Sequence, residues 1–420
     1  MNTNEIRTGQ IIVSNNNREY KVLDLLFQGG RFIDYSVKDV SSDDYHTFRM
    51  YYPSVVNETF KTEIRERTDN NEWLIGVMTF SGHGLNWPID IIDSEDFYGV
   101  ILWRDYSSDS SVSWIDFMHG KENIDQDIIC KACRHLVLLV KGMHEKRFYH
   151  YAELIPEKID TKTGEIILNN FEAVNRMKTG VIGSAKYEAP EVVCGEDNAS
   201  ENTDLYKLAL AIFLLCMRWH PLEGKVWESC KCMDSNIINR IYGTDPIFIF
   251  DPDNDLNRPS KEIEDELVYR WKSYPLFFRE LFVKSFTVGL KNAASRITTD
   301  EWIDAIWKLR SHIRNQKSVE QQGNGLREIV ERYPGIWKER RRLKALLMDY
   351  YVENRVLRNV LYMCVEEEIP HKMEHMESVS AIDFYRLVKL LMESHGCTEE
   401  IAKQSVEMWA YALNTDIDYN

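Results

Sequence analysis

The longest uncharged apolar stretch of the chain is a ten-residue run over 208–217, between Lys207 and Arg218. This run is too short to cross a bilayer, because a membrane-spanning helix needs about 20 apolar residues. A helix that is apolar on every side must instead be enclosed by other parts of the protein. The chain must therefore surround this segment with further packed elements.

Charge and composition restrict the setting in which such a protein works. The 51 Lys and Arg residues against 67 Asp and Glu leave a net charge of -16, the wrong sign for neutralising nucleic-acid phosphates or an anionic membrane. The first ten residues have no apolar core that would act as a targeting signal. Eight cysteines in 420 residues are too sparse for a disulfide scaffold. We therefore expect a cytoplasmic protein with reduced thiols, without nucleic-acid or membrane partners.

The hydrophobic pattern changes twice along the chain and suggests its domains. Short β-branched and aromatic runs predict strands over 10–14, 20–27, 31–38, 48–52 and 98–103, with one helix over 57–67 between them. Apolar spacing of three and four residues predicts helices from residue 124 onward. The segment 314–325 lacks this periodicity and ends in two glycines, so we predict a linker there. The expected domains are 1–106, 107–313 and 326–420.

The last of these domains has the pattern of a small helical bundle. Apolar residues recur at helical spacing and predict four or five helices over 326–420. A basic cluster over 338–344 lies in a segment with more acidic than basic residues. We therefore interpret this cluster as a solvated face, and not as a nucleic-acid site.

The most specific string of the chain is GSAKYEAPE over 183–191, which precedes Asp204 and the apolar run. It is followed by HPLEG over 220–224 and, near residue 300, by Arg296. This ordered set resembles the large lobe of protein kinases. The stretch 242–259 is similar to loops in bacterial members of the eukaryotic-like Ser/Thr kinase family. The resemblance extends over residues from about 10 to 311.

The resemblance implies an α+β, bilobal kinase-like fold. It has a β-rich N-terminal lobe and a helical C-terminal lobe, here followed by the all-α bundle. In this family Glu191 would pair with Arg296, and Asp204 would anchor the catalytic loop. Both roles are structural, since an internal ion pair ties two segments together without performing chemistry.

The positions that carry catalysis in protein kinases have changed chemistry. When the loop is aligned on its shared pattern over 154–159, the catalytic Asp becomes Glu153 and the Asn that holds a second Mg²⁺ becomes Lys158. The Asp-Phe-Gly motif becomes Asn170, Phe171 and Glu172. Lys158 would place a cation where a cation should bind, and the Asn170 amide brings no charge to offset a triphosphate.

The small lobe departs from the family in a similar way. Of the three glycines of the phosphate loop only Gly29 is in place, next to Gly30, while Phe27 and Phe32 stand at the other two positions. A tight Gly29-Gly30 hairpin turn is the structural alternative to a phosphate loop. Asp34 replaces the Val that covers the adenine in the family. Arg49 takes the place of the phosphate-pairing Lys, and Glu63 is the best candidate for its partner on the helix.

These departures together favour a pseudokinase that acts as a regulatory or scaffolding protein. Its partner would be an active kinase, a phosphatase or a substrate of one. Two other classes stay open: an atypical ATP-dependent kinase or nucleotidyl transferase that uses Glu153 and Asn170, and a nucleotide-sensing module without turnover.

The same departures lead us to expect a nucleotide cleft that is occluded, or at least unable to hold Mg·ATP with micromolar affinity. Any ATP, with or without Mg²⁺, would be held through Gly29, Gly30, Arg49 and Glu63, and we expect no resident cofactor. Cys130 and Cys133 have metal-like spacing but lie in a helical pattern without a second Cys or His pair, so we expect no metal there.

Overall fold

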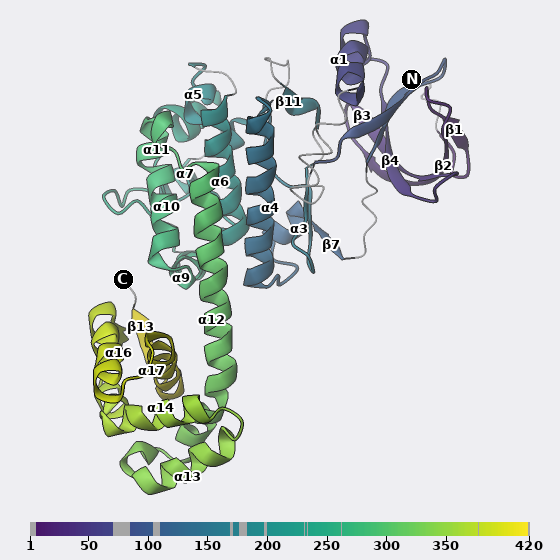
Figure 1. Cartoon of the computed structure of the whole chain (residues 1–420). Helices are drawn as coiled ribbons and strands as arrows, with labels where there is room; N and C mark the ends of the chain where they lie inside the picture. Colours follow the sequence, from purple (N-terminus) through teal and green to yellow (C-terminus); the bar gives the residue numbers. More distant parts are fainter. Residues whose placement is uncertain are drawn as a thin grey trace. The chain divides into compact units, whose positions relative to one another are not determined.

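The computed structural model describes residues 6–69, 85–103, 110–168, 171–175, 183–196, 200–230, 232, 234–261, 263–376 and 378–418. The chain divides into two compact units, Met1–Ile306 and Trp307–Asn420. The first unit contains a curled antiparallel sheet and a helical part, and the second is mainly helical (Figure 1). The expected α+β architecture, with a β-rich N-terminal lobe, a helical C-terminal lobe and a helical C-terminal region, is confirmed.

The N-terminal lobe is built on one antiparallel sheet with the strand order β1-β2-β3-β4-β6-β5. Its strands are β1 Ile11–Val13, β2 Glu19–Gln28, β3 Phe32–Asp39, β4 Tyr45–Tyr51, β5 Pro88–Asp93 and β6 Tyr98–Leu102, and helix α1 covers Glu58–Asp69. Strand β5 was not predicted from the sequence. It begins with a proline, and it lies at the sheet edge, where a residue without an N–H group is tolerated.

The C-terminal lobe is arranged around α6, Glu201–Met217, in which every residue from Thr203 onward is buried. Ser200 caps this helix, because its hydroxyl accepts from the Thr203 N–H. Helices α4 and α10 run beside it (Figure 1). None of the described helices combines the length and the apolar character that crossing a bilayer requires. The apolar run of the sequence is therefore the central core helix.

The helices and strands around α6 vary in length, and α4 and α12 are the longest of these helices. The helices are α3 Trp114–Met118, α4 Gln126–Glu145, α5 Pro190–Val193, α7 Lys225–Glu228, α8 Ser235–Asn239, α9 Glu264–Ser273, α10 Leu276–Phe286, α11 Val288–Lys291 and α12 Thr299–Arg332. The strands are β7 Ser111–Ser113, β8 Tyr149–His150, β9 Lys158–Asp160, β10 Ile166–Ile167 and β11 Val174–Asn175. The single turns are η1 Phe171–Ala173, η2 Ala185–Tyr187, η3 Arg240–Thr244 and η4 Ala293–Ser295.

The polar residues at the start of α6 hold the loop that follows α4. Asp204 accepts from the His150 backbone N–H at 3.0 Å, and His144 Nε2 lies 3.1 Å from the same carboxylate. Lys207 is 2 % exposed; its ammonium donates to the His150 carbonyl at 2.7 Å and pairs with Glu188 at 2.9 Å. Because a buried charge must find partners, these contacts place the loop firmly on the core helix.

Glu191 and Arg296 are brought together by the structure. Arg296 Nη1 and Nη2 donate to the two carboxylate oxygens of Glu191 at 2.6 and 2.7 Å. Its Nε donates to the Gly289 carbonyl at 3.0 Å. Burial alone would raise the pKa of Glu191, but the hydrogen bonds and charge of Arg296 lower it. The pair joins α5 to the turn before α12.

The loop over 242–259 fills part of the core of this lobe. Phe248 is fully buried and meets Phe213 of α6 edge to face, with ring centroids 5.7 Å apart. Phe250 stacks on Trp271 of α9 at 4.5 Å. The length of this loop is therefore used for packing inside its own lobe.

The C-terminal unit contains the end of α12 and further helices around one apolar core. Its elements are η5 Ile336–Lys338, α13 Arg340–Tyr350, α14 Arg355–Glu366, α15 Ile369–Met373, α16 Ala381–His395, α17 Glu399–Leu413, and the strands β12 Ser378–Ser380 and β13 Asp416–Asp418. The two strands pair in parallel, a feature that the helical spacing of the sequence did not predict.

The linker expected over 314–325 is wrong, because these residues belong to the continuous helix α12. Its glycines serve packing. A Cβ atom on Gly323 would lie 2.9 Å from the Tyr411 ring, and one on Gly325 would lie 3.2 Å from the Tyr350 ring. The Leu326 N–H donates to the Tyr351 hydroxyl at 2.9 Å. Glycine here allows aromatic rings to approach the helix, at a modest cost in helix propensity.

We expect Arg296→Ala to destabilise the protein by about 3–5 kcal/mol, because it leaves Glu191 without its buried partner. Thermal unfolding of the full chain measures this effect as a fall of several degrees in Tm. The matched control is Lys141→Ala, which breaks the exposed pair of Lys141 and Asp300. Exposed pairs contribute about 0–1 kcal/mol, so equal Tm shifts for the two variants would contradict the expectation.

His220 makes the stability of the C-terminal lobe depend on pH. Its Nε2 lies 2.8 Å from the Lys186 carbonyl, and its Nδ1 accepts from the Leu222 N–H at 3.2 Å. These partners suit a neutral ring with its proton on Nε2. Burial lowers the pKa of His220 to about 4. The folded protein therefore resists protonation of this ring.

An unfolded histidine has a pKa of about 6.5, so the contribution of His220 is fully present above that pH and is lost as the pH falls toward 4. We expect the stability advantage of the wild type over His220→Gln to shrink by about 2 kcal/mol between pH 7 and pH 5. Urea unfolding at these two pH values measures it. Parallel pH profiles for the two proteins would show that the ring is not held neutral.

Candidate functional site

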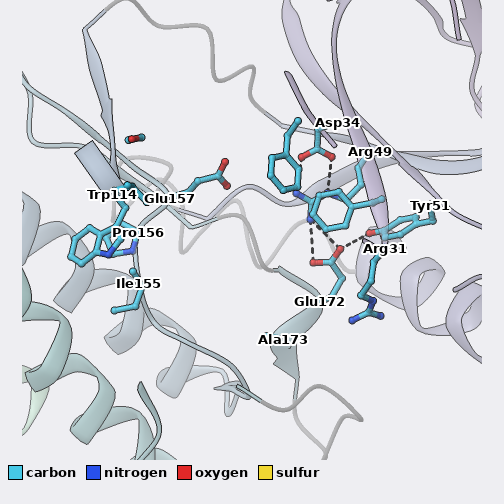
Figure 2. Close-up of a pocket in the computed structure, with 14 residues that line it drawn as sticks. Arg31, Asp34, Arg49, Tyr51, Trp114, Ile155, Pro156, Glu157, Glu172 and Ala173 are labelled. Carbon is cyan, nitrogen blue, oxygen red and sulfur yellow. Dashed lines mark hydrogen bonds and ion pairs between the residues drawn. The ribbon is translucent and has the colours of Figure 1, made fainter. Parts of the chain in front are cut away.

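The first unit contains a cleft of about 620 Å³ at the inner face of the N-terminal sheet (Figure 2). Its apolar walls are formed by Phe27, Phe32, Trp114, Ile115, Ile155 and Pro156. The ionisable residues that line it are the carboxylates of Asp34, Glu157 and Glu172, the guanidinium groups of Arg31 and Arg49, and Tyr51. In Figure 2 Trp114, Ile155, Pro156 and Glu157 stand opposite the group of Asp34, Arg49, Tyr51 and Glu172.

Arg49 is 1 % exposed and forms a two-point ion pair with Asp34. Its Nε and Nη2 atoms donate to the two oxygens of Asp34, each at 2.9 Å. Asp34 on β3 lies directly opposite Arg49 on β4 in the strand register, so the side chains meet on one face of the sheet. The planar fork of Arg matches a carboxylate in this geometry, which a lysine cannot do.

Glu172 supplies a second carboxylate to the same guanidinium from the C-terminal lobe. Arg49 Nη1 donates to its two oxygens at 3.1 and 3.3 Å, and the Tyr51 hydroxyl donates to it at 2.5 Å. Arg67 of α1 donates to the Glu172 backbone carbonyl at 3.2 Å. The turn η1 is thereby tied both to the sheet and to α1.

Electrostatics strengthens this cluster. Burial would lower the pKa of Arg49, but Glu172 and Asp34 raise it well above its usual value, so the guanidinium stays charged. Burial and the neighbouring Glu172 raise the pKa of Tyr51 strongly, so its hydroxyl keeps the proton that it donates. Burial also raises the pKa of Asp34, against the opposing charge of Arg49. The cluster combines one buried cation with two carboxylates.

The aromatic side chains beside the β2–β3 turn cover this cluster. The Phe32 ring lies over the Arg49 guanidinium at 3.7 Å, and the Phe27 ring is 5.8 Å from that of Phe32. Gly29 donates its N–H to the Phe32 carbonyl at 3.0 Å, which closes the hairpin. A Cβ atom on Gly29 would lie 2.7 Å from the Phe27 ring. Gly29 therefore makes room for Phe27 in a hairpin turn, and Gly30 has open space around it.

The structure pairs Glu63, which we expected to be the partner of Arg49, with a different residue. Glu63 is half-buried and pairs with Arg67 one turn further along α1, at 3.7 Å, while Asp34 and Glu172 hold the Arg49 guanidinium. The sequence offered an i, i+4 pair within α1 that satisfies Glu63 locally. Asp34, which the sequence analysis placed over the adenine position, instead carries a charge compensated by Arg49.

The degenerate catalytic positions are not brought together in this cleft. Glu153 accepts from the Ser184 backbone N–H at 2.7 Å, and neither it nor Lys158 is among the described residues that line the cleft. Lys158 lies in β9, between β7 and β10. Asn170 lies outside the described residues. Ile155, Pro156 and Glu157 form the cleft wall from this loop.

Among the residues that the structure describes, Phe27 and Phe32 do not close the cleft as we expected. Phe27 is 50 % exposed, and Phe32 lies against Arg49. The cleft volume of about 620 Å³ falls within the range of about 300–1,000 Å³ typical of small-molecule sites.

Glu172 is the site residue whose role the sequence analysis missed. From the sequence, Glu172 is identified only as the third residue of the changed Asp-Phe-Gly motif. The sequence contained one signal for this role, a carboxylate directly after Phe171 together with an arginine at position 49. Two opposite charges so far apart in the sequence indicate a salt bridge only once the structure shows that their segments meet.

Comparisons with known proteins bear on the fold alone. No protein-family model and no curated protein sequence matches the chain. The kinase domain of Mycobacterium tuberculosis PknI is similar to it at 14 % identity, covering 73 % of this chain and 99 % of that one with a TM-score of 0.46. Vaccinia related kinase 3 is similar at 12 % identity, covering 63 % of this chain and 84 % of that one with a TM-score of 0.45. Similarity at this level carries no argument about what this chain does or to which family it belongs.

We expect Arg49→Lys to destabilise this protein. A single ammonium cannot make the fork to Asp34 and the contact to Glu172 together, and each hydrogen bond to a charged group contributes about 1.5–3 kcal/mol. The loss should reach at least about 2 kcal/mol in urea unfolding. Arg31→Lys, at an exposed arginine of the same cleft, is the control. Equal stability of the two variants would contradict the role of the fork.

Proposed function

We propose that this chain is a pseudokinase, a degenerate member of the Ser/Thr protein kinase family that regulates or scaffolds through protein contacts and transfers no phosphate. The observation that carries the proposal is the state of Arg49. Its guanidinium is buried, held by Asp34 and Glu172, and covered by Phe32. A phosphate would have to displace two carboxylates in a desolvated setting to reach it.

The balance of charges in the cleft also supports the proposal that the chain transfers no phosphate. Three carboxylates face two guanidinium groups among the described lining residues, so the wall as a whole does not favour a triphosphate. Phosphoryl transfer depends on positioned metal ions and compensating cations more than on covalent chemistry. Lys158 stands where the family places a metal ligand, and the Glu153 carboxylate already accepts from Ser184. These features weigh against an atypical kinase or nucleotidyl transferase that uses Glu153 and Asn170.

One observation favours a second candidate, a ligand-sensing module without turnover. The cleft is open, is lined by apolar and aromatic side chains, and has the size of a small-molecule site. A sensor would bind a nucleotide or another small molecule here and alter contacts with a partner. In the pseudokinase proposal that partner is an active kinase, a phosphatase or a substrate of one.

The proposal is tested by neutralising the carboxylates that hold Arg49. We expect the wild type to transfer no radiolabel from ATP to itself or to a protein substrate with Mg²⁺ or Mn²⁺, and to show no thermal shift with ATP. The double variant Asp34→Asn and Glu172→Gln leaves the Arg49 charge uncompensated. It should bind ATP at least about tenfold more tightly, about 1.4 kcal/mol, in calorimetry.

The control is Asp43→Asn with Glu95→Gln, which changes the net charge equally at exposed positions of the same lobe. It should leave ATP binding at the wild-type level. Micromolar binding of Mg·ATP by the wild type, or label transfer that disappears in Glu153→Ala, would overturn the pseudokinase proposal. A metal-independent thermal shift in the wild type would support the sensor instead.

A further inference from the structure

The C-terminal unit carries two histidines and a carboxylate on one exposed turn. His371, Glu374 and His375 each offer one ligand atom, and the three atoms lie within 4.8 Å of one another. His371 Nδ1 is 3.4 Å from Glu374 Oε2, and the two imidazole rings are 5.3 Å apart between centroids. This cluster lies in a different unit from the cleft and has no part in the function proposed above.

The backbone explains why these side chains converge. His371 lies in α15, and the chain stays helical at Glu374, with φ -52° and ψ -25°. The Glu374 N–H donates to the Pro370 carbonyl at 3.0 Å, which continues the turn. Residues at i, i+3 and i+4 of a helical turn share one face. The three ligand atoms are therefore brought together by local structure, without any rearrangement of the fold.

The opposite side of the same turn is anchored in the core. Ile369, Pro370 and Met373 are buried, and Ile369 and Met373 are completely enclosed. The buried side chains thus hold the backbone of this turn in place, while His371, Glu374 and His375 are all exposed. A fixed backbone lowers the entropy lost when side chains order around a ligand.

From this arrangement we propose that His371, Glu374 and His375 form a binding site for a divalent transition-metal ion of the zinc class. Two imidazoles and one carboxylate are a ligand set suited to Zn²⁺ or Ni²⁺, whereas Mg²⁺ and Ca²⁺ take oxygen ligands. Ligand atoms around a tetrahedral ion with bonds of ~2.1 Å stand ~3.4 Å apart. Rotation of exposed side chains is enough to reach this spacing from 4.8 Å. Water would complete the coordination.

Lys338 is the neighbouring charge that opposes the metal. Its ammonium lies 3.4 Å from Glu374 Oε2, on a side chain that is 59 % exposed. An exposed pair of this kind contributes about 0–1 kcal/mol, so a metal ion can displace it. The pair also offers the competing explanation, in which Glu374 serves only a surface network with Lys338 and His371.

The test is calorimetric titration of the full reduced chain with ZnCl₂ and, separately, NiCl₂ in a non-coordinating buffer. We expect His371→Ala and His375→Ala each to weaken the binding of one metal equivalent by more than about tenfold, because even outer-sphere partners of a metal change affinity by about 10–100-fold. Both side chains are exposed, so circular dichroism should show an unchanged fold.

Two further variants make the result specific. His119→Ala removes an exposed histidine of the other unit and should leave the titration unchanged. Lys338→Gln removes the competing ammonium and should tighten binding of that equivalent a few-fold. Identical isotherms for the wild type and the double variant His371→Ala with His375→Ala would overturn the proposal. Binding of MgCl₂ with the same dependence on these histidines would overturn the assignment to the zinc class.

Discussion

A buried guanidinium is stable in the folded protein only when carboxylates pair with it, and this constraint organises the N-terminal lobe around Arg49. Asp34 meets it from the neighbouring strand, and Glu172 reaches it from the turn η1 in the other lobe. Phe32 covers the exposed side of the group. The same contacts that satisfy the charge also shape the cleft wall, so its chemistry follows from the way in which Arg49 is buried.

The C-terminal lobe uses buried charge in the same way but for anchoring. Lys207 joins the His150 carbonyl to Glu188, and Asp204 holds the His150 backbone N–H. Because α6 is enclosed, each polar group on it must find a partner among the surrounding segments. These contacts hold the loop that follows α4 on the core helix, and neither Glu153 nor Lys158 is among the described residues that line the cleft.

Local sequence patterns were sufficient to predict an element whose formation depends on its own segment alone. The predicted strands of the N-terminal lobe and the central helix follow from alternation and from an apolar run, and the structure contains them. Strand β5, an edge strand, escaped prediction because it starts with a proline, a residue that does not favour strands. The linker over 314–325 was wrong because the Gly323 and Gly325 signals are used for close aromatic packing on α12. A glycine in a sequence can mark either a flexible backbone or a place where another group approaches the backbone closely. Only the residues packed around it show which of the two applies.

The sequence by itself determined that an enclosed apolar helix must sit in a larger helical lobe and that a β-rich lobe precedes it. The tertiary structure alone decided the partners. Glu63 pairs with Arg67 in its own helix. Glu172, which is 123 positions from Arg49 in the sequence, supplies the second carboxylate that pairs with Arg49. Side-chain periodicity is a local property of the chain, whereas the pairing of buried charges depends on which distant segments the packed core brings within hydrogen-bond distance.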